Sequence, residues 1–81
     1  MNKMKFKELY DVLDVDMLIK VYDTDYADED NSGLVYCEKA YYLEGSFTWI
    51  EIHNKKVCHI NTSVYDDKPI MKIYVMSEKR W

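Results

Sequence analysis

The sequence contains few of the residues that break or crosslink a chain: two Gly, one Pro and two Cys in 81 residues. So few breakers, together with 48% hydrophobic residues, exclude a fibrous or an intrinsically disordered protein. The two cysteines, Cys37 and Cys58, are too few for the disulfide framework of a small secreted protein, and we interpret both as reduced core residues. The chain is therefore expected to fold without crosslinks.

Long apolar runs are also missing. No segment approaches the roughly 18 apolar residues that cross a membrane. The basic residues of 1–7 are not followed by the apolar region of a signal peptide. We therefore expect a cytoplasmic protein without membrane attachment. A chain of 81 residues buries one core, so we expect a single domain, 1–81.

Basic residues are scarce between residues 8 and 38. Residues 8–38 hold ten acidic residues against one base, Lys20, whereas the charges elsewhere are mixed or basic. The net charge of the chain is −4, and its acidic part is concentrated in this one region. A negative field repels nucleic acid and lipid headgroups, so we expect no direct binding to either. The predicted partner is a protein with a basic surface.

Apolar periodicity predicts one helix and four strands. The helix covers about 5–14, and its apolar stripe is formed by Phe6, Leu9, Tyr10 and Leu13. Alternating apolar residues predict strands over 15–22, 34–40, 57–65 and 70–76. The expected fold class is α+β, with one N-terminal helix packed on a mainly antiparallel sheet of about four strands. The predicted core consists of Phe6, Leu9, Leu13, Ile19, Val21, Cys58, Ile60, Val64, Ile73 and Val75.

The segment 41–56 fits two structures. Residues 47–52 have high β-propensity, but Ser46 can cap a short helix that directs Phe47 and Ile50 toward the core. We favour the helical turn and keep the strand as the alternative.

Several stretches of apolar spacing carry a resemblance to known proteins. They are residues 4–14, 21–23, 54–57, 63–67 and 71–75. This spacing resembles that of small uncharacterised proteins carried by phages and mobile elements of Gram-positive bacteria. The resemblance implies a phage or mobile-element setting, where small acidic proteins often inhibit host defence, anti-CRISPR proteins among them. It implies no catalytic residue.

Residues 28–35 match the first part of a calcium-binding loop, with oxygen ligands at positions 1, 3 and 5 and glycine at position 6. The match fails at position 12, where Lys39 replaces the bidentate glutamate. Zinc-ligand atoms occur without zinc-site spacing in His53, Cys58, His59 and Cys37. We therefore predict no metal and no cofactor, and keep a weak cation-binding module as an alternative.

No arrangement of residues predicts catalysis. The carboxylates lie in a segment with little apolar material to raise their pKa, and Cys58 and His59 alternate to opposite faces of one strand. We therefore predict that the protein is not an enzyme.

Acidic residues and tyrosines gather in residues 22–42. Tyrosine provides a large contact area and a polar tip, as binding hot spots do. We predict a monomer or weak dimer that binds and inhibits a host defence protein, with an interface formed by Tyr22, Asp23, Asp25, Tyr26, Asp28, Glu29, Asp30 and Tyr36. The next candidate surface is the aromatic segment 41–49. The alternative function is a self-associating structural or accessory protein of a mobile element that uses an exposed strand edge.

Overall fold

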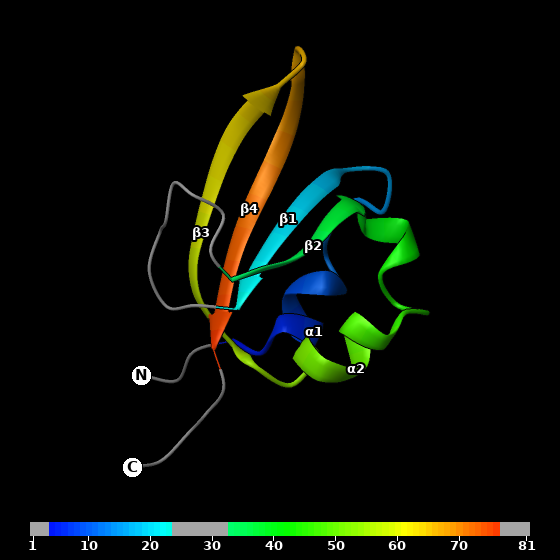
Figure 1. The fold of residues 1–81 in the computed structure, drawn as a ribbon, viewed down its shortest axis with the longest axis vertical. Helices are drawn as coiled ribbons and strands as arrows, with labels where there is room; N and C mark the ends of the chain where they lie inside the picture. Colours follow the sequence, from blue (N-terminus) through cyan, green and yellow to red (C-terminus); the bar gives the residue numbers. More distant parts are fainter. Residues whose placement is uncertain (1–3, 24–32, 77–81) are drawn as a thin grey trace.

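A computed structural model describes residues 4–23 and 33–76, which form a four-stranded sheet and short helices (Figure 1). The strand order is β2-β1-β4-β3. The elements in chain order are α1 (Phe6–Tyr10), β1 (Leu18–Asp23), β2 (Leu34–Lys39), the 3₁₀ helix η1 (Ala40–Tyr42), α2 (Phe47–Ile52), β3 (Lys56–Tyr65) and β4 (Lys68–Met76). The predicted α+β class is confirmed.

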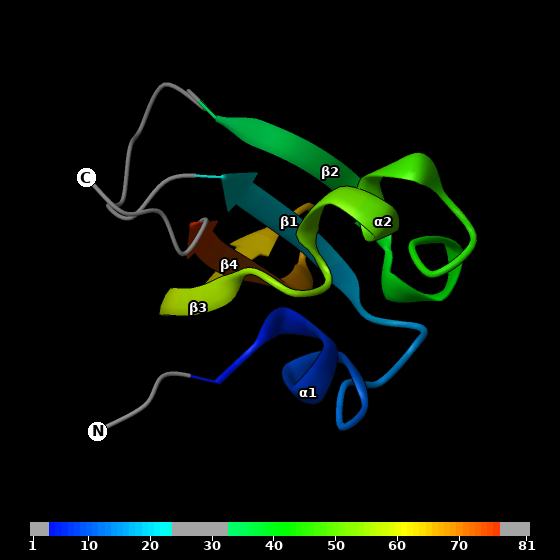
Figure 2. The same cartoon turned by 90° about the horizontal axis from the view of Figure 1, so that it is seen from below.

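The sheet is mixed. β1 pairs antiparallel with β2, and β3 pairs antiparallel with β4, while the two central strands β1 and β4 run parallel. The parallel register sets Val21 beside Ile73, and both side chains are buried. Both helices contribute to the same core cluster as these two residues, so α1 and α2 cover one face of the sheet (Figure 2).

The first helix is shorter than the predicted 5–14. It begins where the Lys5 N–H donates to Glu8 Oε1 at 2.9 Å, and it ends at Tyr10. Asp14 Oδ1 then accepts a hydrogen bond from the Asp16 N–H at 3.0 Å. An aspartate that bonds the backbone two residues ahead stabilises a turn. The first strand therefore begins at Leu18, three residues later than predicted.

Most of the predicted core is confirmed, and the errors lie in the two edge strands. Ile60 is 43% exposed and Val64 71% exposed, because the β3–β4 hairpin extends past the helices (Figure 1). Cys58 is only half-buried, and Cys37 is exposed on the other edge strand, β2. The confirmed core residues are Phe6, Leu9, Ile19, Val21, Ile73 and Val75, with Leu13 packed at their margin.

Candidate protein-binding surface

The segment 40–52 is anchored to the fold by its backbone. The Ala40 N–H donates to Met17 O at 2.9 Å, and the Tyr41 N–H donates to Val15 O at 2.8 Å. Beneath the segment, Leu43 and Ile52 are buried with Ala40 in the core. Since both ends are fixed to the core, the side chains that point outward from this segment are held in defined positions.

The predicted helix in this segment is confirmed, and so is its cap. Ser46 Oγ accepts a hydrogen bond from the Trp49 N–H at 3.3 Å and donates to Leu43 O at 2.7 Å. A serine at this position satisfies backbone groups that a helix leaves unpaired. A helix of six residues is too short to persist alone, so packing on the sheet also stabilises it.

The direction of this helix was predicted wrongly. Trp49 and Ile52 face the core, whereas Phe47 is 86% exposed and Ile50 65% exposed. The Trp49 ring packs against Tyr10 with 4.8 Å between ring centroids and against Phe6 with 6.0 Å. A tryptophan that meets two aromatic rings buries more area than Phe47 would, which favours the observed orientation.

Exposed apolar side chains therefore gather on residues 41–50. Tyr41 and Tyr42 are mostly exposed and lie edge to face, with ring centroids 5.3 Å apart. Phe47 and Ile50 border a hollow of about 250 Å³. We call the side chains of Tyr41, Tyr42, Phe47 and Ile50 the 41–50 surface. The residues 40–52 include two acids and no lysine or arginine, so this surface is apolar with an acidic margin.

A second helical stripe was the signal that sequence reasoning missed. Trp49 and Ile52 are three residues apart, as Phe47 and Ile50 are, and only one of two such stripes on a short helix can face the core. The sequence alone does not determine which of the two stripes faces the core.

The acidic interface that the sequence predicts is described only in part. Tyr22 is 1% exposed and stacks on Tyr74, with 4.7 Å between ring centroids. Asp23 is exposed, and its Oδ2 accepts a hydrogen bond from Lys55 Nζ at 2.5 Å. Tyr36 is half-buried, and its hydroxyl donates to Lys39 O at 2.5 Å. The other predicted residues, Asp25, Tyr26, Asp28, Glu29 and Asp30, lie outside the described residues.

The hydroxyls of Tyr36 and Tyr10 have raised pKa values. Burial raises the pKa of Tyr36 to about 12, and the neighbouring Glu38 carboxylate adds to the effect. Burial, followed by the charge of Glu44, raises the pKa of Tyr10, whose hydroxyl donates to Ala40 O at 2.6 Å. Both hydroxyls are therefore protonated donors at neutral pH, and they hold the chain that leads into the 41–50 surface.

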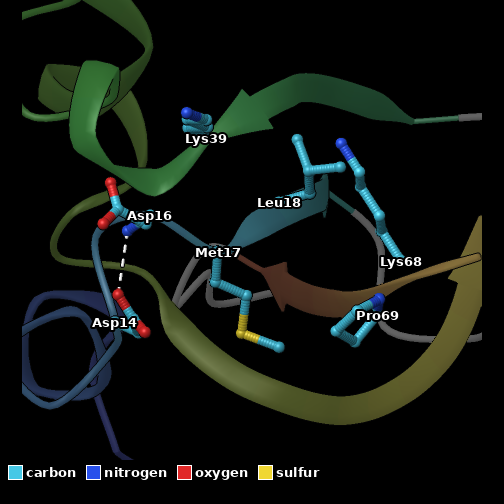
Figure 3. A pocket seen from close by; sticks show the side chains of 7 residues that line it. All are labelled: Asp14, Asp16, Met17, Leu18, Lys39, Lys68 and Pro69. Atoms are coloured by element: carbon cyan, nitrogen blue, oxygen red, sulfur yellow. Dashed lines mark hydrogen bonds between the residues drawn. The ribbon is translucent and has the colours of Figure 1, made fainter.

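A larger hollow of about 520 Å³ lies where β1 and β4 begin and β2 ends (Figure 3). Met17, Leu18 and Pro69 form its apolar part, and four charged side chains lie around it. The charged side chains, all exposed, are Asp14, Asp16, Lys39 and Lys68. Water solvates such groups well, so the hollow does not hold a desolvated charge of the kind that binds or activates a ligand.

The candidate zinc ligands are separated by the sheet. Cys37 lies on β2, whereas Cys58 and His59 lie on β3 at the opposite edge. Across residues 4–23 and 33–76, no three His, Cys, Asp or Glu side chains gather in a way that could hold a metal ion. The half-matched calcium loop lies mainly in 24–32, outside the described residues.

Comparison with known proteins finds no family model that matches this chain, and neither a curated protein nor a solved structure matches it. Within the described part of the chain, no helix is long and apolar enough to span a membrane.

Proposed function

We propose that this protein is a non-enzymatic protein-binding module that uses the 41–50 surface to bind a partner protein. The observation that carries the proposal is the exposure of Phe47 and Ile50 on a capped, anchored helix. A chain of 81 residues has a small core. Exposing large apolar side chains to water is unfavourable in free energy, and burying them against a partner makes binding favourable. Aromatic side chains fixed on a short rigid element are typical anchors of protein interfaces.

The charge of the chain supports a basic partner. The 41–50 surface carries Glu44 and Glu51 at its margin, and residues 8–38 add ten further acids along the sequence. Acidic charge accelerates association with a basic surface, while buried apolar contacts determine how long the complex lasts. The two features therefore have separable effects on binding kinetics.

The setting of this binding is the one that the sequence resemblance implies. In a phage or mobile element of a Gram-positive bacterium, the protein would act in the host cytoplasm. Its partner would be a host defence protein, and binding would inhibit that protein as anti-CRISPR proteins do. A groove that binds nucleic acid is basic, so an acidic and apolar module has the charge needed to block it.

The test is recovery of partner proteins from a host lysate with matched variants. Phe47→Ser combined with Ile50→Ser removes the two anchors from the exposed face of α2. Val12→Ser is the control, because Val12 is also an exposed apolar residue but lies after α1. We expect the wild type and the control to recover the same basic proteins, and the double variant to lose them.

Equal recovery by all three proteins would contradict the proposed role of the 41–50 surface. In that case, charge reversal at Asp25, Asp28 and Asp30 would test the acidic interface that the sequence predicts as the binding surface instead. Circular dichroism of each variant ensures that a loss of binding does not arise from unfolding.

A further inference from the structure

The outer strand of the sheet forms a second surface, independent of the proposed function. β3 has ten residues and lies at the edge of the sheet. Its start is covered by the N-terminal segment, where the Val57 N–H donates to Met4 O at 2.7 Å. Among the described residues, none pairs with the outer edge of β3 from Ile60 to Val64. Residues 58–64 contain no proline and no Asp, Glu, Lys or Arg, which are the residues that usually protect an edge strand from pairing.

The hairpin geometry determines which backbone groups point away from β4. Asp66 and Asp67 both have positive φ, as in the two-residue turn that closes a tight hairpin. Such a turn pairs the Tyr65 carbonyl with the Lys68 N–H, so the backbone groups of Tyr65 face β4. Because the pattern alternates along an antiparallel pair, the N–H and C=O groups of Ile60, Thr62 and Val64 face outward.

The side chains of these three residues lie on the helix side of the sheet. Ile60 is opposite Ile73 in β4, whose side chain belongs to the core beneath the helices. Ile60, Thr62 and Val64 are nevertheless exposed, since the hairpin extends past α1 and α2 (Figure 1). The outward backbone groups of this edge therefore lie on the same stretch of β3 as two exposed aliphatic side chains, Ile60 and Val64.

We propose that two copies of the protein associate by antiparallel pairing of β3 with β3 about a two-fold axis at Thr62. In this register Thr62 meets the second copy's Thr62, and Ile60 meets the second copy's Val64. The outward backbone groups of each copy then face outward groups of the other, which is the condition for a continuous ladder. Thr–Thr and aliphatic pairs across strands both stabilise a sheet.

Charge favours the same register. In this register the acidic turn of one copy, Asp66–Asp67, lies beside the start of β3 in the other copy, close to Lys56. The strand is therefore complementary to a second copy of itself in backbone groups, apolar side chains and charge. In Figure 1 the ribbon of β3 and the ribbon of residues 40–50 lie on opposite sides of the molecule, so pairing through β3 takes place away from the segment that carries the 41–50 surface.

The test is sedimentation equilibrium of the full chain over a concentration series. We expect a reversible dimer whose dissociation constant rises about tenfold or more in Thr62→Lys, because two like charges then meet across the axis. The matched control is Asn61→Lys, which adds the same charge at a neighbouring exposed position on the other face of the strand. We expect a much smaller change in the control.

A second measurement needs no variant. Amide hydrogen exchange by NMR should slow for Ile60, Thr62 and Val64 as the wild-type concentration rises, with little change in β2. A chain that stays monomeric at about 1 mM would overturn the proposal, since weak complexes are populated at that concentration. Equal effects of the two lysine variants, or protection confined to β2, would overturn it as well.

Discussion

Ile60 and Ile73 lie opposite each other across β3 and β4, but only Ile73 is buried. We expect Ile73→Ala to lower the free energy of unfolding by about 2–4 kcal/mol, as truncation in a packed core does. Ile60→Ala, for which the sequence alone predicts the same cost, should now cost about 1 kcal/mol or less in the monomer. Urea denaturation of both variants at low protein concentration measures the difference, and equal losses would place Ile60 in the core.

The raised pKa of Tyr36 predicts a loss of stability in alkali. Below pH 10 the hydroxyl is protonated in both the folded and the unfolded state, so its contribution is constant. Between pH 10 and about 12 only the unfolded state loses the proton, so the free energy of unfolding falls with rising pH. Tyr36→Phe should be less stable at pH 8, by about 1 kcal/mol, because it lacks the hydrogen bond to Lys39 O.

The variant should also lose less stability than the wild type between pH 10 and 12. Thermal unfolding at a series of pH values measures, for each protein, the stability at pH 8 and the stability lost between pH 10 and 12. Parallel curves for wild type and variant would assign the alkaline loss to other groups, among them Tyr10, whose pKa is also raised by burial.

At the scale of single elements, α2 depends on its cap. Ser46→Ala removes the acceptor for the Trp49 N–H and the donor to Leu43 O, so we expect a loss of about 1–2 kcal/mol in unfolding free energy. Ser63→Ala, an exposed serine of β3, is the control and should change stability by less than about 0.5 kcal/mol. Chemical denaturation measures both changes.

The same variant links the element to binding. If α2 positions Phe47 and Ile50, loosening it should weaken partner binding even where the protein remains folded, because the anchors lose their fixed orientation. Unchanged binding in folded Ser46→Ala would show that the cap serves stability alone.

At the scale of the whole molecule, the uneven charge predicts salt-dependent association. Reversing Asp25, Asp28 and Asp30 to lysine should leave folding nearly intact, since the sequence predicts no core residue there and solvated carboxylates contribute little to stability. The change should slow association with a basic partner at low salt and have less effect at high salt, where charges are screened. Stopped-flow kinetics at two ionic strengths measures this, and an unchanged on-rate would exclude these three aspartates from the encounter.

Metal is not expected to stabilise the molecule. Residues 28–35 match a calcium loop only up to the position where Lys39 replaces the closing glutamate. The Tm should therefore be the same within about a degree in EDTA and in micromolar calcium, because a ligand stabilises only when its concentration exceeds its dissociation constant. A rise of many degrees with calcium would show that the loop is a binding site.

Local patterns in the sequence determined much of this fold. The alternation of apolar residues placed four strands, and the Ser46 cap placed α2. These signals are readable because hydrogen bonds of caps and turns, and the two faces of a strand, depend on residues close together in the chain. The concentration of acidic residues in 8–38 is likewise a property of the sequence alone.

Tertiary structure decided which apolar faces are covered. Trp49 faces the core because Phe6 and Tyr10 of α1 lie beside it, and Phe47 is consequently exposed. Ile60 and Val64 have the alternation of core residues, but strand order puts them on an edge that the helices do not reach. Burial depends on contacts between residues distant in sequence. The apolar periodicity of a single segment contains no information about these contacts. Each proposed interaction surface contains two apolar residues for which the sequence predicted burial and which the fold leaves exposed, Phe47 and Ile50 in one and Ile60 and Val64 in the other.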